Sequence, residues 1–231
     1  MSTVIRIDDA KALAQAAAET VAGWLRSALS EQPRASLALS GGRTPLLAYQ
    51  ALALSTLDWA HIDFFFVDER CVPPEHPDSN FRLVREALFD RIVARDTQVF
   101  RMQGEMPDRD AAARAYEARL PDRLDVAVLG LGEDGHTASL FPGSSALAED
   151  TRRVVAVVGP KPPPHRLTLT PVALRAVRHT LVLASGNEKA DAVRRALEDE
   201  GTIEETPGRL AREALWLLDT QAATQLRGEP S

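Results

Sequence analysis

The fold is decided by the stretch Val126-Ala127-Val128-Leu129-Gly130-Leu131-Gly132-Glu133-Asp134-Gly135-His136. Its apolar first half does not alternate with polar residues, which is typical of a strand covered on both faces. The glycines that follow allow a tight turn, which places His136 where we expect a helix to start. The run Phe64-Phe65-Phe66-Val67 has the same uninterrupted character. The sequence therefore predicts two central strands of a sheet that is buried on both sides.

Short apolar runs alternate with longer amphipathic stretches along the chain, which is typical of strand–helix–strand units that feed a largely parallel sheet. We expect a single α/β domain over residues 1–231, with a Rossmann-like, doubly wound and largely parallel central sheet flanked by helices. The expected strands are Ser36–Ser40, Ile62–Asp68, Leu124–Leu131, Arg153–Val158, Arg166–Thr170, Thr180–Ser185 and Leu215–Asp219. The expected helices are Ala10–Ser30, Thr44–Leu54, Ser79–Ile92, Arg109–Leu120, Pro171–Val177, Glu188–Glu200 and Gly208–Ala214.

The composition is that of an ordinary globular protein of 231 residues, with 27 Lys+Arg against 33 Asp+Glu and a net charge of −6. The single cysteine, Cys71, cannot form an internal disulfide or a multi-thiolate zinc site, and the five histidines lack metal-binding spacing. We therefore expect no metal and no cofactor. The mild acidity argues against a nucleic-acid partner, and no run approaches the roughly 20 apolar residues of a membrane span. Without a secretory signal pattern, we expect a cytoplasmic protein.

The first loop with chemical character is Ser40-Gly41-Gly42-Arg43-Thr44-Pro45. Its glycines let the backbone turn and present N–H groups, Thr44 is a good N-cap, and Pro45 suits the start of a helix. Backbone donors at the positive end of a helix favour an anion, and Arg43 adds a charge. A plain strand–helix turn explains these residues equally well, and they do not match the nucleotide-binding pattern that ends in Gly-Lys-Ser/Thr.

A second loop of this design is Ser185-Gly186-Asn187-Glu188-Lys189. We expect Lys189 in the first helical turn, where a cation is unfavourable unless an anion compensates for it. Taken alone, Lys189 fits a solvated side chain. Two such loops at the carboxyl edge of one sheet, where open α/β sheets bind ligands, favour a phosphorylated small molecule.

Three charged residues, Asp68-Glu69-Arg70, follow the predicted strand Ile62–Asp68. Charges at the end of a buried strand are costly unless they are solvated or paired. The carboxyl end of this strand lies at the edge of the sheet where ligands bind. An exposed strand end with a local ion pair is the alternative interpretation. Farther along, Asp78-Ser79-Asn80 is typical of a helix cap, and Asn80 is a further candidate for the site.

The glycines Gly130, Gly132 and Gly135 formally match the dinucleotide-binding pattern G-x-G-x-x-G. We reject that interpretation because Glu133 and Asp134 would place two negative charges beside a pyrophosphate. The glycines instead predict a loop that exposes His136 at a strand end, with Asp134 able to orient its ring. The other histidines have no such setting, and we treat them as structural or solvated.

At this point the chain resembles the 6-phosphogluconolactonases, which share a superfamily with the glucosamine-6-phosphate deaminases. The resemblance covers nearly the whole chain and rests on five motifs in the right order: Leu39–Pro45, Phe66–Arg70 with Ser79-Asn80, Gly130–Pro142, Arg166–Thr168 and Gly186–Lys189. It implies the hydrolysis of 6-phospho-D-glucono-1,5-lactone to 6-phosphogluconate, the second step of the oxidative pentose phosphate pathway.

The resemblance also implies roles for residues. His136 would be the general base, Asp68 and Arg70 would line the sugar site, and the phosphate would be held by Arg166, Lys189 and the loop Ser40–Thr44 (Ser40, Gly41, Gly42, Arg43 and Thr44). Many relatives have Ser where this chain has Arg43, so a phosphate contact by Arg43 rests on its charge alone.

The choice between the two reactions depends on a residue that differs. The deaminases carry a Phe-Asn-Glu-Pro run after the histidine, and its glutamate falls where this chain has Phe141. Lactone opening needs only one base and oxyanion donors, with neither a metal nor a covalent intermediate. Asp134 would fix the histidine tautomer or form the turn, and Arg70 would stabilise the oxyanion or bind a hydroxyl.

The alternative function is that of a regulatory module, which would bind a sugar phosphate without converting it. Such sensors usually adjoin a DNA-binding segment. Strands and helices are expected here from within the first ten residues, so we expect no such segment before them. The expected partner is a small phosphorylated lactone, and we expect a monomer or a small homo-oligomer.

Overall fold

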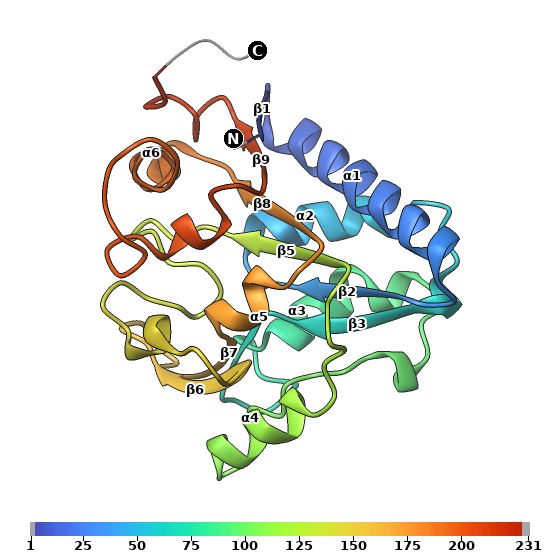
Figure 1. Ribbon diagram of the computed structural model, residues 1–231. Helices are drawn as coiled ribbons and strands as arrows, with labels where there is room; N and C mark the ends of the chain where they lie inside the picture. Colours follow the sequence, from blue (N-terminus) through green and yellow to red (C-terminus); the bar gives the residue numbers. More distant parts are fainter. Residues whose placement is uncertain (1–2, 228–231) are drawn as a thin grey trace.

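The computed structural model describes residues 3–227. Its main sheet has six strands in the order β1-β9-β8-β5-β2-β3, and every neighbouring pair in it is parallel. The strands are β1 (Thr3–Ile7), β2 (Ala35–Leu39), β3 (Ile62–Phe66), β5 (Val126–Gly130), β8 (His179–Ala184) and β9 (Leu215–Asp219). The four residues Val126–Leu129 are almost fully buried. The predicted α/β fold with a largely parallel central sheet is confirmed (Figure 1).

A second, antiparallel sheet has the order β4-β7-β6, with β4 at Asp68–Arg70, β6 at Val154–Val158 and β7 at His165–Leu169. This second sheet was not expected from the sequence, although both of its longer strands were. The loop 159–164 is too short for a parallel crossover, which takes about a dozen residues or more, so the two strands form a hairpin.

The expected strand Ile62–Asp68 is in fact divided between the two sheets. The N–H of Val67 donates to the carbonyl of Leu39 in β2, while the N–H of Leu169 in β7 donates to the carbonyl of Val67. Val67 is therefore the point where the chain leaves the large sheet for the small one. This step places Asp68 and Arg70 in β4, the edge strand of the small sheet.

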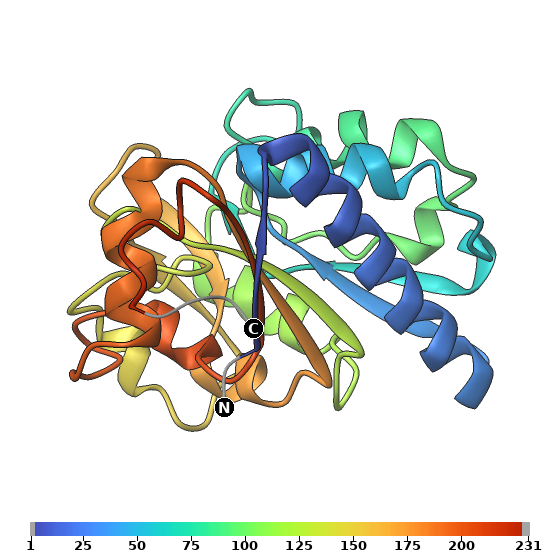
Figure 2. The ribbon, with the colours of Figure 1, turned by 90° about the horizontal axis from the view of Figure 1, so that it is seen from above.

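The helices are α1 (Ala10–Glu31), α2 (Arg43–Leu52), α3 (Asn80–Ala87), α4 (Arg109–Glu117), α5 (Pro171–Arg175) and α6 (Ala190–Leu197). The helix expected at Gly208–Ala214 is a short 3-10 segment, Pro207–Ala211. Figures 1 and 2 show that α1 covers one side of the large sheet. The small sheet lies on the other side, together with α5 and α6. No helix formed by residues 3–227 combines the length and the apolar character that crossing a membrane requires.

The strand order fixes where a ligand can bind. From β2 the chain proceeds outward to β3, and it later returns to β5 on the opposite side of β2 before continuing to β8. The order therefore reverses between β2 and β5, and open α/β sheets bind ligands beside such a reversal, at the carboxyl ends of the strands. The loops that begin at Ser40 and at Leu131 leave the sheet at this place.

Helix α1 illustrates how the sequence encodes its elements, and it provides a stability test. Asp9 caps its start by accepting hydrogen bonds from the N–H groups of Lys11 and Ala12, both at 2.8 Å. Gly23 lies in the middle of the helix, and a Cβ added there would meet no atom within 4 Å.

We expect Gly23→Ala to raise the free energy of unfolding by about 0.5–1 kcal/mol, because alanine loses less backbone entropy than glycine on forming a helix. Urea unfolding followed by circular dichroism measures this change. A destabilised variant would contradict the open environment that the structure gives Gly23.

Candidate active site

A cavity of about 570 Å³ opens at the carboxyl ends of β2, β5 and β8. Eleven of the twelve predicted site residues line it: Ser40, Gly41, Gly42, Arg43, Thr44, Asp68, Arg70, Asn80, His136, Arg166 and Lys189. The twelfth, Asp134, is hydrogen-bonded to His136 and lines a neighbouring cavity of about 1320 Å³. Although that second cavity is larger, it contains only one predicted site residue, so the smaller cavity is the candidate active site.

His136 and Asp134 form a hydrogen-bonded pair. Nδ1 of His136 lies 2.5 Å from Oδ1 of Asp134, and the backbone N–H of His136 donates to the same oxygen at 3.2 Å. Burial alone would raise the pKa of Asp134, but the hydrogen bond and the charge of His136 lower it to about 2. When His136 is neutral, an ionised Asp134 accepts the proton of Nδ1, and this tautomer leaves Nε2 as a proton acceptor.

The loop that carries this pair depends on glycine. A Cβ on Gly132 would lie 2.0 Å from Nδ1 of His136 and 2.6 Å from Oδ1 of Asp134. Gly135 has φ +88°, which side chains rarely adopt. No helix starts at His136, contrary to expectation, and a tight turn closed between Thr137 and Leu140 follows it instead. Gly132 is thus required for the close approach of the two side chains.

Phe141 contacts both the imidazole of His136 and the buried guanidinium of Arg166. Its ring centroid lies 4.6 Å from that of His136, and the guanidinium carbon of Arg166 lies 5.4 Å from the Phe141 ring centroid. Phe141 is 5% exposed, so it shields one face of the imidazole from water. The phenyl ring therefore limits the orientations open to His136 and gives Arg166 a cation–π contact.

The carboxylate of Asp68 is buried but faces the cavity. Its Oδ2 accepts a hydrogen bond from the hydroxyl of Ser139 at 2.5 Å, and its Oδ1 accepts one from Nδ2 of Asn80 at 3.0 Å. Ser139, three residues beyond His136, was not among the predicted site residues. Asp68 is therefore held between the loop after β5 and the start of α3.

Glu69 serves the architecture beside Asp68. Its buried carboxylate accepts hydrogen bonds from the backbone N–H groups of Arg70, Asn80 and Phe81 and from the hydroxyl of Ser79. Burial raises its pKa, which the three backbone hydrogen bonds oppose. Glu69 thus ties β4 to the N-terminus of α3 and fixes Arg70 and Asn80, which both line the cavity.

The first glycine loop holds its residues by close packing. The hydroxyl of Tyr49 donates to the carbonyl of Ser40 and accepts from its N–H. A Cβ on Gly41 would lie 1.9 Å from Oδ1 of Asn80. The helix N-cap is Gly42, with φ 101°, and not Thr44 as expected, because α2 already begins at Arg43.

The cations around the cavity differ in their settings. Lys189 ends a 3-10 turn, rather than lying inside the first turn of α6, and its Nζ is 3.8 Å from Oε1 of Glu133. Arg166 is buried, which lowers its pKa, and its Nη2 donates to the carbonyl of Lys161. The side chain of Arg43 is 96% exposed and lies 4.0 Å from Glu188.

The second glycine loop is anchored by Asp219, which the sequence analysis also missed. Its carboxylate accepts hydrogen bonds from the hydroxyl of Ser185 at 2.5 Å and from the N–H of Gly186. Asp219 ends β9, so the neighbouring strand holds in place the loop that carries Lys189.

Unpartnered polar atoms concentrate at this cavity. Five buried side-chain atoms in the range 3–227 have no hydrogen-bond partner, and four belong to residues that line it: Ser40 Oγ, Arg70 Nε, Asn80 Oδ1 and Arg166 Nε. Buried polar groups are normally paired, so such a concentration indicates a site prepared for a polar ligand. Residues 3–227 contain no group of three His, Cys, Asp or Glu side chains that could hold a metal ion.

Comparisons with known proteins identify the family of the chain. The family model of glucosamine-6-phosphate isomerases/6-phosphogluconolactonase matches residues 8–217. The chain is 37% identical to a 6-phosphogluconolactonase of Mycobacterium tuberculosis, over 98% of this chain and 99% of that protein. The solved 6-phosphogluconolactonase of Trypanosoma brucei superposes with a TM-score of 0.87 at 30% identity, over 98% of this chain and 99% of the other.

The chain therefore belongs to the family of glucosamine-6-phosphate isomerases and 6-phosphogluconolactonases. Within this family, the enzyme class that the full-length matches support is 6-phosphogluconolactonase. The fold alone does not separate the two classes. A monomeric glucosamine-6-phosphate deaminase superposes with a TM-score of 0.86 at 25% identity, over 97% of this chain and all of the other.

Proposed function

We propose that the protein hydrolyses 6-phospho-D-glucono-1,5-lactone to 6-phospho-D-gluconate in the pentose phosphate pathway. The proposal rests on one observation above all: the oriented imidazole of His136 shares a cavity with Lys189, Arg166 and Arg70. The names of the similar proteins support the same reaction. A six-membered lactone is an activated ester, so one base and suitable donors are enough for its opening.

His136 acts on water in the proposed mechanism. Nε2 accepts a proton from a water molecule while the water oxygen forms a bond to C1 of the lactone. The bond between C1 and the ring oxygen then breaks, and the imidazolium returns the proton to that oxygen, which becomes a hydroxyl. Asp134 stabilises the transient imidazolium through Nδ1. General base catalysis of this kind contributes about 10²- to 10⁴-fold.

Asp68 and Arg70 would recognise the sugar in this mechanism. The carboxylate of Asp68 faces the cavity and can accept hydrogen bonds from sugar hydroxyls. Arg70 anchors one nitrogen on the carbonyl of Asp78 and leaves Nε without a partner. This guanidinium is placed either to stabilise the oxyanion at C1 or to bind a hydroxyl.

The phosphate would bind at the two glycine loops. The donors come from the unpartnered hydroxyl of Ser40, the backbone N–H groups of residues 41–44 and the charges of Lys189 and Arg166. The exposure of Arg43 favours a side chain that faces solvent, so the proposal relies on the other two cations. Binding energy from the phosphate, remote from C1, orients the reacting carbon.

We expect Lys189→Ala to raise KM for the phosphorylated lactone by about 10- to 100-fold, with a much smaller change in kcat. A hydrogen bond to a charged group contributes about 1.5–3 kcal/mol, and each 1.4 kcal/mol is tenfold. Steady-state kinetics measure the split between the two constants. Lys11→Ala, which removes an exposed lysine at the start of α1, is the matched control. An unchanged KM in Lys189→Ala would remove this residue from the phosphate site.

Two reactions assayed on one preparation test the proposed function. Acid release from freshly made 6-phosphogluconolactone, corrected for spontaneous hydrolysis, measures lactone opening, and ammonia release from glucosamine 6-phosphate measures deamination. We expect the first to rise with protein concentration and the second to stay at background, because Phe141 supplies no acid–base group beside His136. Ammonia release without lactone hydrolysis would overturn the assignment.

A further inference from the structure

The loop that carries the His136–Asp134 pair is hydrogen-bonded to residues from the C-terminal part of the chain. Nη2 of Arg195 donates to the carbonyl of Glu133 at 3.1 Å, and Nη1 donates to the carbonyl of Asp134 at 3.4 Å. The N–H of Gly208 donates to the carbonyl of Gly135 at 2.8 Å. Three consecutive carbonyls of the loop, immediately before His136, are therefore bound by donors that lie about 60 residues or more along the sequence.

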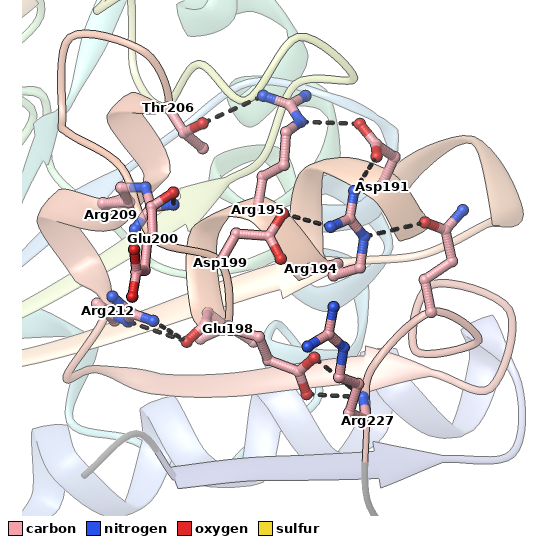
Figure 3. A network of polar contacts seen from close by, with 12 residues as sticks. Asp191, Arg194, Arg195, Glu198, Asp199, Glu200, Thr206, Arg209, Arg212 and Arg227 are labelled. Carbon is pink, nitrogen blue, oxygen red and sulfur yellow. Dashed lines mark hydrogen bonds and ion pairs between the residues drawn. The ribbon is translucent and has the colours of Figure 1, made fainter.

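Arg195 is itself fixed in place. Its Nε donates to Oδ2 of Asp191 at 2.8 Å, one turn earlier in α6, and its Nη1 also reaches the hydroxyl of Thr206 at 3.2 Å (Figure 3). A planar guanidinium presents several donors in a rigid fork, so it can bridge neighbouring carbonyls in a way that a single ammonium cannot. The loop is thus braced against α6 and the segment around Thr206.

Arg195 and Thr206 pack closely against the loop at Gly135. A Cβ on Gly135 would lie 2.9 Å from Cγ2 of Thr206 and 3.2 Å from Nη1 of Arg195. The loop therefore approaches Arg195 at a distance that only glycine allows at this position. Movement of Arg195 would be transmitted directly to the backbone that carries Asp134 and His136.

The same segment of chain also carries Lys189, directly before α6. Glu133 is contacted twice from this segment, through its carboxylate by Lys189 and through its carbonyl by Arg195. Lys189, which is proposed to bind the phosphate, and Arg195, which holds the catalytic loop, therefore belong to the same segment of the chain.

We infer that Arg195 is a positioning residue for the reaction, which sets the placement of the His136–Asp134 pair relative to the bound lactone. This inference rests on the proposed function. Arg195 lines neither cavity, so it acts through the loop and not on the substrate. A displacement of about 1 Å by a remote change can cost about 100-fold in rate, so we expect Arg195→Met to lower kcat by about 10- to 100-fold. KM should stay within about twofold, because Lys189 and the first glycine loop are untouched.

Arg194 supplies a matched control on the same helix. Its side chain is 27% exposed, like that of Arg195, and it pairs with the same Asp191 at 2.8 Å. Its other partners are Asp199 and Gln225, and neither belongs to the catalytic loop. Figure 3 shows both arginines meeting at Asp191, with only Arg195 directed to Thr206. Arg194→Met therefore removes a comparable ion pair and leaves the loop braced.

The experiment compares wild type, Arg195→Met and Arg194→Met by kcat, KM and amide hydrogen exchange of the peptide that covers residues 131–137. We expect Arg195→Met alone to lose kcat at nearly constant KM and to exchange faster in this peptide. Equal kcat values in the two variants would overturn the inference, and so would a loss in Arg195→Met carried by KM. A wild-type protein without lactone hydrolysis would overturn the proposed function itself. The two failures are therefore distinguishable.

Discussion

Replacing His136 with alanine is expected to lower kcat for lactone hydrolysis by about 10²- to 10⁴-fold, the contribution of a positioned general base. Among residues 3–227, His136 provides the only imidazole that lines the cavity, and its loss leaves the carboxylate of Asp134 without its 2.5 Å partner. Because the cations of the phosphate site remain, KM should change little. An equal fall in kcat and kcat/KM would identify an interaction made in the transition state.

His61→Ala is the control for this prediction. His61 is about half-exposed, pairs with Asp58 in a short 3-10 segment and does not line the cavity. Both variants should keep the circular dichroism spectrum of the wild type. Turnover by a folded His136→Ala variant at the rate of His61→Ala would rule out His136 as the base.

Gly132→Ala is expected to lower kcat by at least about 100-fold, although the substitution adds only one methyl group. The new Cβ would lie 2.0 Å from Nδ1 of His136, so the imidazole or the loop must move. A misplacement of this size at a catalytic group is sufficient for a loss of that order. Steady-state kinetics on fresh phosphorylated lactone measure the effect.

Gly23→Ala provides the comparison for Gly132→Ala, since it makes the same chemical change where nothing lies within 4 Å. It should keep the wild-type kcat. If Gly132→Ala also kept it, the tight packing between Gly132 and the His136–Asp134 pair would not matter for the reaction. The account of the loop would then be wrong.

Much of the fold follows from local sequence patterns. The uninterrupted apolar run Val126–Leu129 predicted a strand buried on both faces, which is where β5 lies in the sheet. The order of the strands could not be predicted, because it depends on pairing between residues far apart in sequence. The edge strand β1 was missed, since Thr3–Ile7 is only partly buried and lacks a strong apolar pattern.

The second sheet was missed for a different reason. A strand that passes from one sheet to another at Val67 shows no break in its apolar pattern, because Val67 is buried between both sheets. The strands at Val154–Val158 and His165–Leu169 were found, but their separation from the large sheet was not. Strand propensity reports that a segment is extended, and it does not specify the partner.

The predicted site residues gather at one cavity because four of their motifs follow strands of the sheet or cap a neighbouring helix. The residues that hold them in place were not predictable in the same way. Ser139 bonds to Asp68 across 71 positions of sequence, and Arg195 reaches the loop across about 60. Their residue types are common, and nothing in the local pattern distinguishes them from surface side chains.

Arg43 shows the limit of arguing from charge alone. Its place beside two glycines suggested an anion contact, yet its side chain is 96% exposed. Arg166 gave no local signal of this kind and is buried at the cavity with Nε unpartnered. Burial and unsatisfied hydrogen bonding, which only the folded chain displays, identify the better candidate.

The most direct test of the account is the rate of acid release from fresh 6-phosphogluconolactone and from the same lactone without its phosphate, measured on one preparation of the unmodified protein. We expect saturable release from the phosphorylated lactone, proportional to protein concentration, and release near the spontaneous rate from the lactone without phosphate. Phosphorylated lactone that opens no faster with the protein than without it would contradict the account.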